Sequence, residues 1–149
     1  MTSFLEVNMP KEGIFYMVEE KTPEGIRHDL HYANKQIIPL QQSCLKFLNE
    51  LCIAHLTTLK GRLDAIRLRF NLHKNIPIYI SPCLVLMTVK AGNKKYYLNY
   101  YKIAETKNLG KGKTLIAFVD GNSLILDVSI TVLQNRIKTV ERLLKEGPF

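Results

Sequence analysis

This sequence of 149 residues contains no tryptophan and only three cysteines, and it lacks long hydrophobic runs. Cys44, Cys52 and Cys83 are an odd and sparse set, which argues against a disulfide framework and indicates reduced thiols. No apolar run approaches the roughly 18 residues of a membrane span, so we expect no membrane partner. The N-terminus also lacks the basic and apolar regions of a secretory signal, and we therefore expect a cytoplasmic protein.

The remaining composition is that of a folded globular chain. Hydrophobic residues make up 46% of the sequence and charged residues 23%. A chain of this length buries roughly two-thirds of its unfolded surface without help from metals or disulfides. We therefore expect residues 1–149 to form a single domain that needs no cofactor.

Acidic residues are scarce in the middle of the chain. Residues 43–113 contain thirteen basic residues (Lys or Arg) and three acidic ones. Residues 1–42 contain four basic and six acidic residues, and residues 114–149 contain four of each kind. The net charge of +8 is thus concentrated in one region. A localised positive field attracts polyanions. The alternative is a solvated basic face without a partner.

The groups that catalysis or metal binding would need are poorly represented. The central region has only Glu50, Asp64 and Glu105 as acids, so no facing carboxylate pair is evident. His28 and His31 have a ligand-like spacing but lack a nearby third ligand. The cysteines lie among Leu, Ile and Val, where they usually serve as small core residues. We therefore expect neither an enzyme nor a metal site.

The clearest structural pattern lies near the C-terminus. Residues 115–119 and 124–128 are apolar runs joined through Asp120-Gly121-Asn122, which is typical of a β-hairpin. Ser129 then provides a helix N-cap, and apolar residues recur at spacings of three and four up to Leu144. The sequence predicts a strand, a turn, a strand and a helix over about residues 130–146.

The rest of the chain predicts a mainly antiparallel β fold with one central helix. Ser43 is a candidate N-cap for a helix over about residues 43–60, with Gly61 just after its end. The fold class is therefore α+β, with a β meander or barrel-like sheet. Apolar runs that predict further strands cover residues 6–9, 14–20, 26–32, 76–82, 83–90 and 96–104.

Basic residues cluster after the central helix. Residues 66–70 alternate apolar side chains with Arg67 and Arg69, which predicts a strand with both guanidinium groups on its exposed face. Residues 107–113 are expected to be a flexible basic loop. We predict groove insertion or phosphate clamping by Arg62, Arg67 and Arg69, and contacts to a nucleic-acid backbone by Lys60, Lys74, Lys94, Lys95, Lys111 and Lys113.

Several short motifs resemble the ComK family of competence transcription factors, in the same order and at nearly the same spacing, over about residues 36–137. The hairpin motif Phe118-x-x-Gly121-x-Ser123-Leu124 is one of them. The other motifs are Ser43-Cys44 with Phe47, Gly61-Arg62, His73-Lys74, Pro77-Ile78-x-Ile80-x-Pro82 and Tyr97-Leu98-Asn99. The final hairpin and helix also look, more faintly, like the end of LytTR-type DNA-binding domains.

This resemblance implies a DNA-binding activator of DNA-uptake genes. Its partner would be double-stranded DNA at A·T-rich promoter sites, contacted largely through the minor groove, and the protein would act as a homo-oligomer. The chain departs from the family pattern at Asn75-Ile76, where a proline is expected, and it ends at Phe149 where family members usually continue.

Two alternatives remain open from the sequence. The first is a shortened ComK-like protein-interaction module that binds no DNA itself and modulates a full-length regulator through residues 130–144 or the aromatic strand. RNA binding through stacked tyrosines is a third reading, although no RNA-recognition pattern is present.

Overall fold

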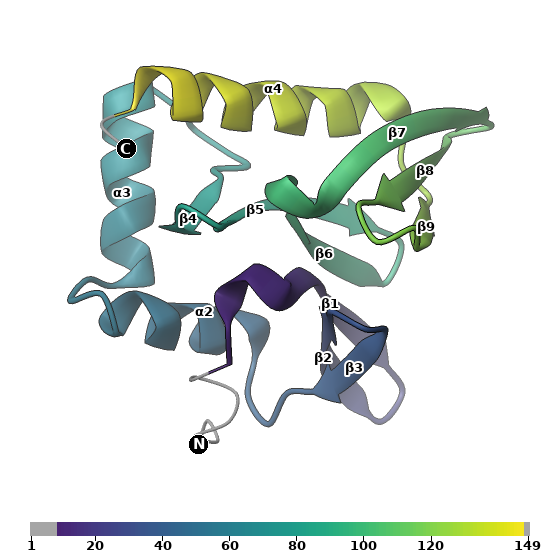
Figure 1. The fold of residues 1–149 in the computed structure, drawn as a ribbon, viewed down its shortest axis with the longest axis horizontal. Coiled ribbons are helices and arrows are strands. Elements are labelled where there is room, and N and C mark those ends of the chain that lie inside the picture. Colours follow the sequence, from purple (N-terminus) through teal and green to yellow (C-terminus); the bar gives the residue numbers. More distant parts are fainter. Residues whose placement is uncertain (1–8, 148–149) are drawn as a thin grey trace.

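The computed structural model describes residues 9–147, and these residues form an α+β fold, which confirms the predicted class (Figure 1). The described strands are β1 (Ile14–Thr22), β2 (Gly25–Tyr32), β3 (Gln36–Pro39), β4 (Ile78–Ser81), β5 (Leu84–Ala91), β6 (Lys94–Asn99), β7 (Ile103–Gly110), β8 (Lys113–Phe118) and β9 (Ser123–Leu126). The described helices are α2 (Cys44–Ile53), α3 (Leu59–Phe70) and α4 (Ile130–Glu146), with 3₁₀ turns η1 (Lys11–Gly13) and η2 (Tyr100–Lys102).

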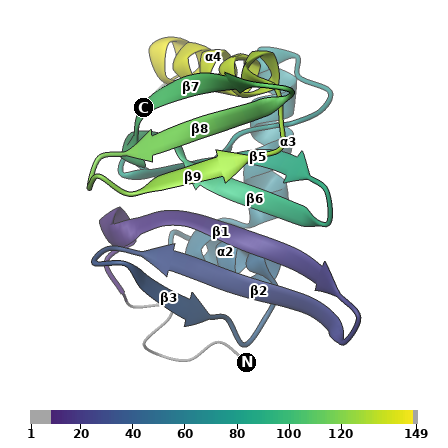
Figure 2. The ribbon, with the colours of Figure 1, turned by 90° about the vertical axis from the view of Figure 1, so that its right-hand side faces the viewer.

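The strands form two open antiparallel sheets. The larger sheet has six strands in the order β3-β2-β1-β6-β5-β4, and the smaller has three in the order β7-β8-β9. The antiparallel pairing confirms the predicted meander, but neither sheet closes into the barrel-like form that was expected. Instead, the smaller sheet and α4 cover one face of the larger sheet, while α2 covers the other face (Figure 2).

Alternating side chains give the larger sheet two apolar faces. In β5, Leu84 and Leu86 pack in the core on the α2 side, whereas Val85, Met87 and Val89 pack in the core formed with the smaller sheet and α4. Successive side chains of a strand point to opposite faces, so one strand can serve both cores. This double burial holds β5 in place between the two layers.

The C-terminal hairpin and helix confirm the sequence prediction. Strands β8 and β9 pair antiparallel across the turn at Gly121, whose φ of 90° suits glycine. The Ser129 hydroxyl accepts a hydrogen bond from the backbone N–H of Val132 at 3.3 Å, which caps α4. Leu133 and Val140 are fully buried against the sheets.

The predicted central helix is two helices, and the predicted strand at residues 66–70 belongs to the second. Helix α2 ends at Ile53, and α3 begins after Thr58, whose hydroxyl accepts a hydrogen bond from the Gly61 N–H at 3.0 Å. Gly61 therefore lies in the first turn of a helix rather than after the end of one. The buried residues of α3 explain the error, because Leu59, Ile66 and Phe70 recur at helical spacing.

The predicted basic loop at residues 107–113 is a β-hairpin formed by the end of β7 and the start of β8. Lys111 and Gly112 have φ values of 54° and 73°, as a tight two-residue turn requires. Most of β7 is exposed, so it carries no hydrophobic alternation that would have predicted a strand. The strand expected at residues 6–9 falls mainly outside the described residues.

Within residues 9–147, none of the helices has both the length and the apolar character that crossing a lipid bilayer demands.

The three cysteines are free thiols, and burial distinguishes them. Cys44 and Cys52 are buried, whereas Cys83 is partly exposed. Burial, followed by the carboxylates of Glu19 and Asp29, raises the pKa of the Cys44 thiol to about 12. The thiolate is the reactive form, so Cys44 stays protonated and unreactive through pH 9.

We therefore expect a thiol reagent at pH 8 to modify Cys83 rapidly in the native protein, and Cys44 and Cys52 only after unfolding in guanidinium chloride. Absorbance of the released chromophore measures both phases. Cys83→Ser should remove the fast phase alone. Two or three rapidly reacting thiols in the native protein would contradict the burial of the other two.

Candidate nucleic-acid interface

A groove of about 480 Å³ lies where α3, the segment 71–77, β5, β6 and α4 meet. We call it the basic groove. The basic side chains that line it are Arg67, His73, Lys74, Lys90, Lys95 and Arg136. No Asp or Glu belongs to its lining among the described residues. Its apolar walls come from Leu63, Ile76 and Tyr97, among others.

The groove exists because β4 is short. Strand β4 pairs with β5 only as far as Leu86, so the remainder of β5 has a free edge on that side. Arg136 of α4 reaches this edge, where its Nε donates a hydrogen bond to the Thr88 carbonyl at 3.0 Å. Burial lowers the pKa of Arg136 from its usual value. One arginine thus satisfies an edge carbonyl and adds positive charge to the groove.

Two lysines face each other across the strands that form the groove. In the antiparallel register of β5 and β6, Lys90 lies directly opposite Lys95. Like charges at opposed positions repel and destabilise a sheet. The Lys95 ammonium lies 5.2 Å from the centroid of the Tyr97 ring, an arrangement that partly offsets the repulsion. A polyanion bound here would relieve it further.

Arg67 lies on the α3 wall of the groove, where it forms an ion pair with the Asp64 carboxylate. Its Nη1 donates to Asp64 Oδ1 at 2.6 Å, while Lys60 Nζ donates to Asp64 Oδ2 at 2.8 Å. The hydrogen bond from Lys60, and then that from Arg67, lowers the pKa of Asp64. All three side chains are exposed to water, where such pairs are weak and easily screened. Arg67 can therefore exchange Asp64 for a phosphate at low cost.

Arg62 lies outside the groove and joins α3 to β4. Its Nη1 donates to the carbonyls of Tyr79 and Ile80, both at 2.7 Å, and its Nε donates to the Thr57 hydroxyl at 2.7 Å. Successive carbonyls of a regular strand point in opposite directions. The register of β4 shifts between Tyr79 and Ser81, and this irregularity lets the two successive carbonyls face the same guanidinium group. These contacts indicate that Arg62 has a structural role.

Four other predicted residues lie at three separate places. Arg69 donates to the Glu146 carbonyl at 3.1 Å and lies 5.7 Å from the Phe70 ring centroid, at the end of α4. Lys94 begins β6 and lines a different pocket with Glu20 and Asp29, on the sheet face opposite to Lys95. Lys111 and Lys113 lie at the β7–β8 turn. Of the nine residues predicted, the groove brings together three, namely Arg67, Lys74 and Lys95.

Sequence reasoning missed three residues of the groove, His73, Lys90 and Arg136. Lys90 precedes the basic turn 91–95, so its place in the same hairpin as Lys95 was available from the sequence. Arg136 lies on the polar face of the predicted C-terminal helix, with no local signal that it would cross to β5. Only the packing of α4 against the sheets reveals it.

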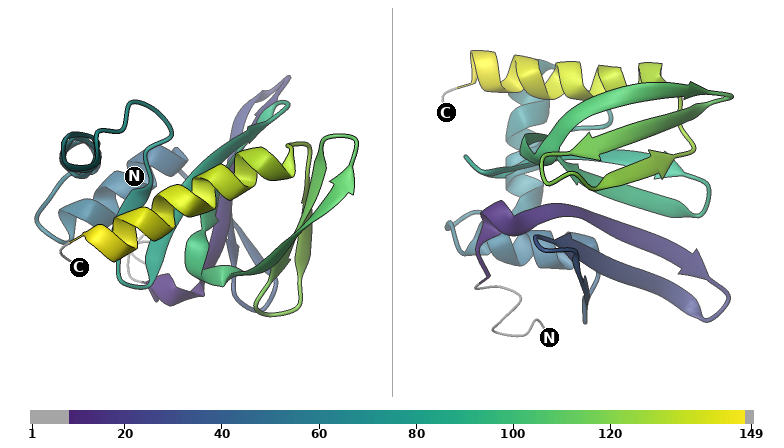
Figure 3. Two further views of the ribbon diagram at one scale, coloured as in Figure 1. Left: turned by 90° about the horizontal axis from the view of Figure 1, so that it is seen from above. Right: turned by 45° about the vertical axis from the view of Figure 1, so that its right-hand side comes forward.

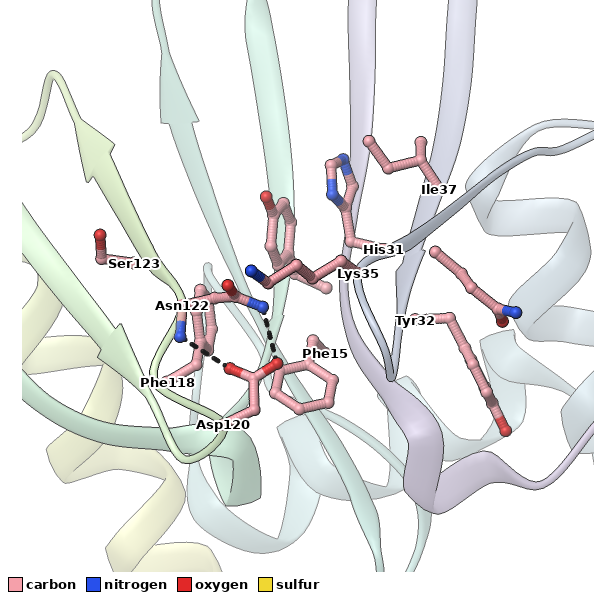
Figure 4. A pocket seen from close by; sticks show the side chains of 11 residues that line it. Phe15, His31, Tyr32, Lys35, Ile37, Phe118, Asp120, Asn122 and Ser123 are labelled. Carbon is pink, nitrogen blue, oxygen red and sulfur yellow. Dashed lines mark hydrogen bonds between the residues drawn. The ribbon is translucent and has the colours of Figure 1, made fainter.

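A second cavity, of about 260 Å³, lies between the two sheets and has a different character (Figure 4). Tyr16 stacks on His31 with ring centroids 4.2 Å apart and on Phe118 at 5.4 Å. Asp120 and Lys35 contribute opposite charges to its rim. Because the charges are mixed and the walls aromatic, this cavity does not suit a polyanion as the basic groove does.

Two other groupings of chemically active side chains were expected to be weak. Within residues 9–147, no three His, Cys, Asp or Glu side chains come together as metal ligands would. His28 Nδ1 lies 3.4 Å from Cys44 Sγ, but burial holds the pKa of that thiol high, which disfavours the reactive thiolate.

Comparison with known proteins identifies one family. The family model described as "ComK protein" matches residues 24–145, which is most of the chain. No curated protein and no solved structure matches the chain significantly.

The contacts of Arg62 generate a stability prediction. We expect Arg62→Ala to lower the free energy of unfolding by about 2–3 kcal/mol, because a hydrogen bond from a charged group contributes roughly 1.5 kcal/mol or more and two carbonyls lose their donor. Arg62→Lys keeps the charge but loses the planar fork, so it should also be destabilised. Urea denaturation followed by circular dichroism measures both variants. Lys46→Ala, on the exposed side of α2, is the control and should change little; a wild-type midpoint for Arg62→Ala would contradict the structural role.

The facing lysines generate a second prediction. Lys90→Gln should raise the free energy of unfolding by about 0.5 kcal/mol at low ionic strength, because one of two opposed ammonium groups is removed. The gain should shrink as salt screens the repulsion. Urea denaturation at two salt concentrations measures it, with Lys46→Gln on the exposed side of α2 as the matched control. Equal increases in the free energy of unfolding of both variants would show that the lower net charge, rather than the Lys90–Lys95 repulsion, is responsible.

Proposed function

This chain belongs to the ComK family of competence transcription factors, and from that premise we propose that it is a DNA-binding transcriptional activator of DNA-uptake genes. Its binding sites are A·T-rich promoter sequences. It acts in the cytoplasm as a homo-oligomer.

The basic groove is the observation that carries the proposal. Five permanently cationic side chains line it, and no acid among the described residues does so. Each phosphate that Lys or Arg neutralises releases a condensed counterion, so clustered cations give affinity for duplex DNA. We assign phosphate contacts to Lys74, Lys90 and Lys95, and contact within a narrow A·T-rich groove to Arg67, where the negative potential is strongest.

The other predicted basic residues receive separate roles in this proposal. Lys94, on the face of β6 opposite to Lys95, contributes only to the general positive field, and Lys111 and Lys113 form a second basic region on the β7–β8 hairpin. Lys60 and Arg69 contribute to the general field. Arg62 serves the fold, because its donors are engaged by Thr57 and two backbone carbonyls.

The competing proposal is a protein-interaction module acting on a full-length regulator. It needed either the apolar face of residues 130–144 or the aromatic strand to be available. Leu133 and Val140 are instead buried in the chain's own core, and so are Tyr96 and Tyr97. This burial favours DNA over a protein as the ligand.

A charge-matched pair of variants tests the proposal. Lys74→Gln with Lys90→Gln should weaken binding to an A·T-rich duplex and lower the slope of log affinity against log salt by about two, since each lost phosphate contact removes about one ion. Lys46→Gln with Lys145→Gln removes the same charge elsewhere on the exposed surface and should preserve most of the slope. Fluorescence anisotropy with A·T-rich and G·C-rich duplexes at several salt concentrations measures both, and light scattering gives the oligomeric mass.

Three outcomes would count against the proposal. They are no binding to either duplex, binding that ignores salt, and equal losses from the two double variants. A preference for the G·C-rich duplex would overturn only the sequence assignment.

A further inference from the structure

The β7–β8 hairpin reaches beyond the body of the molecule. Figure 1 and both views of Figure 3 show its tip extending past the N-terminal end of α4. Every residue from Lys107 to Lys113 is exposed. A projecting two-stranded ribbon contributes little to the core, so its composition is free to serve another purpose.

The tip of this ribbon has a defined turn and a bulge. Lys111 and Gly112 make a two-residue turn in which both φ values are positive. The pairing of β7 with β8 shifts between Asn108 and Gly110, so Leu109 is the unpaired residue of a bulge. The Asn108 Oδ1 accepts a hydrogen bond from the Gly110 N–H at 2.9 Å, which braces the bulge from within.

Leu109 is an apolar side chain in a basic setting. It is 44% exposed, and no buried cluster of the described residues includes it. Lys107, Lys111 and Lys113 surround it in sequence, and the nearest acid along the chain is Glu105. Lys113 Nζ lies 3.5 Å from Asp127, an exposed pair that salt or a phosphate can replace. Thus the tip combines one apolar side chain with three cations.

Proteins that bend DNA use this combination. An apolar side chain enters between adjacent base pairs, unstacks them and kinks the duplex, while Lys and Arg hold the flanking phosphates. A·T-rich sequences contain TA steps, which unstack and kink most easily. A ribbon can deliver such a side chain because it is narrow, and the glycines at 110 and 112 keep it so.

We infer that Leu109 is a wedge that inserts between base pairs and bends the DNA, with Lys107 and Lys111 on the adjacent phosphates. The inference rests on the proposed function and extends it to a second contact. The turn between β5 and β6, which precedes Lys94, lies at the same end of the molecule as the ribbon tip (Figure 3). Asn93 in that turn donates to the Lys21 carbonyl at 2.8 Å, which ties it to the β1–β2 hairpin. In this proposal one bent duplex meets both the basic groove and the ribbon tip.

Energy transfer between dyes at the two ends of a short A·T-rich duplex containing a central TA step tests the inference. Wild-type protein should raise the transfer efficiency on binding. Leu109→Ala should still bind with an unchanged salt slope but lose most of that rise, while Leu109→Met, which keeps an apolar wedge, should retain it. Leu68→Ala is the matched control, because Leu68 is 82% exposed on α3, away from the ribbon.

The outcomes separate the two proposals. If wild-type protein binds no duplex, the proposed function fails. If it binds without changing the transfer efficiency, or if Leu109→Ala bends DNA as well as wild type, the wedge is overturned while DNA binding stands. A thermal midpoint of Leu109→Ala equal to that of wild type confirms that the loss is not a folding defect.

Discussion

The candidate site depends on one constraint, which is that β4 pairs with β5 only as far as Leu86. A longer β4 would cover the edge of β5 and fill the space where the basic groove lies. The uncovered edge leaves a carbonyl at Thr88, and Arg136 from α4 donates to it. An unpaired backbone group is costly if buried, so the arginine has a structural reason to be there before any ligand arrives. Positive charge at this edge also discourages pairing with another sheet.

Two arginines show how one residue type serves different ends in this fold. Arg62 has its donors occupied by two carbonyls of β4 and the Thr57 hydroxyl. Within residues 9–147, the one ion-pair partner of Arg67, five positions later on the same helix, is the water-accessible carboxylate of Asp64. The hydrogen bonds of Arg62 occupy its donors and are costly to break, whereas the exposed ion pair of Arg67 is weak in water. Basic side chains on a nucleic-acid interface should belong to the second kind.

The sequence predicted the elements whose signals are local. Asp120-Gly121-Asn122 and Ser129 fix a turn and a helix start by their own chemistry, and both were correctly placed. Residues 66–70 were misread because five residues of alternating character fit either a strand or a helix, and only Leu59 upstream shows the helical spacing. Strand β7 escaped prediction because it is an exposed edge strand with little apolar content.

The candidate site was predictable only in part, for a similar reason. Density of charge along the chain identified Arg67, Lys74 and Lys95, which lie within thirty residues of one another. Arg136 comes from a helix that follows the smaller sheet, so no sequence neighbourhood contains it and the others together. The contacts that occupy Arg62 are equally hidden, because they depend on an irregularity in β4 that side-chain pattern does not encode.

The opposition of Lys90 and Lys95 has a further consequence for how this protein responds to ionic strength. Added salt screens their repulsion and so favours the folded chain by itself, yet the same screening weakens attraction to a polyanion. The free energy that a bound duplex adds to the fold is therefore largest in dilute buffer, where the repulsion between the two lysines is least screened. As the salt concentration rises, the thermal midpoint of the unbound protein should increase while the extra stability given by bound DNA decreases, so the two midpoints should converge.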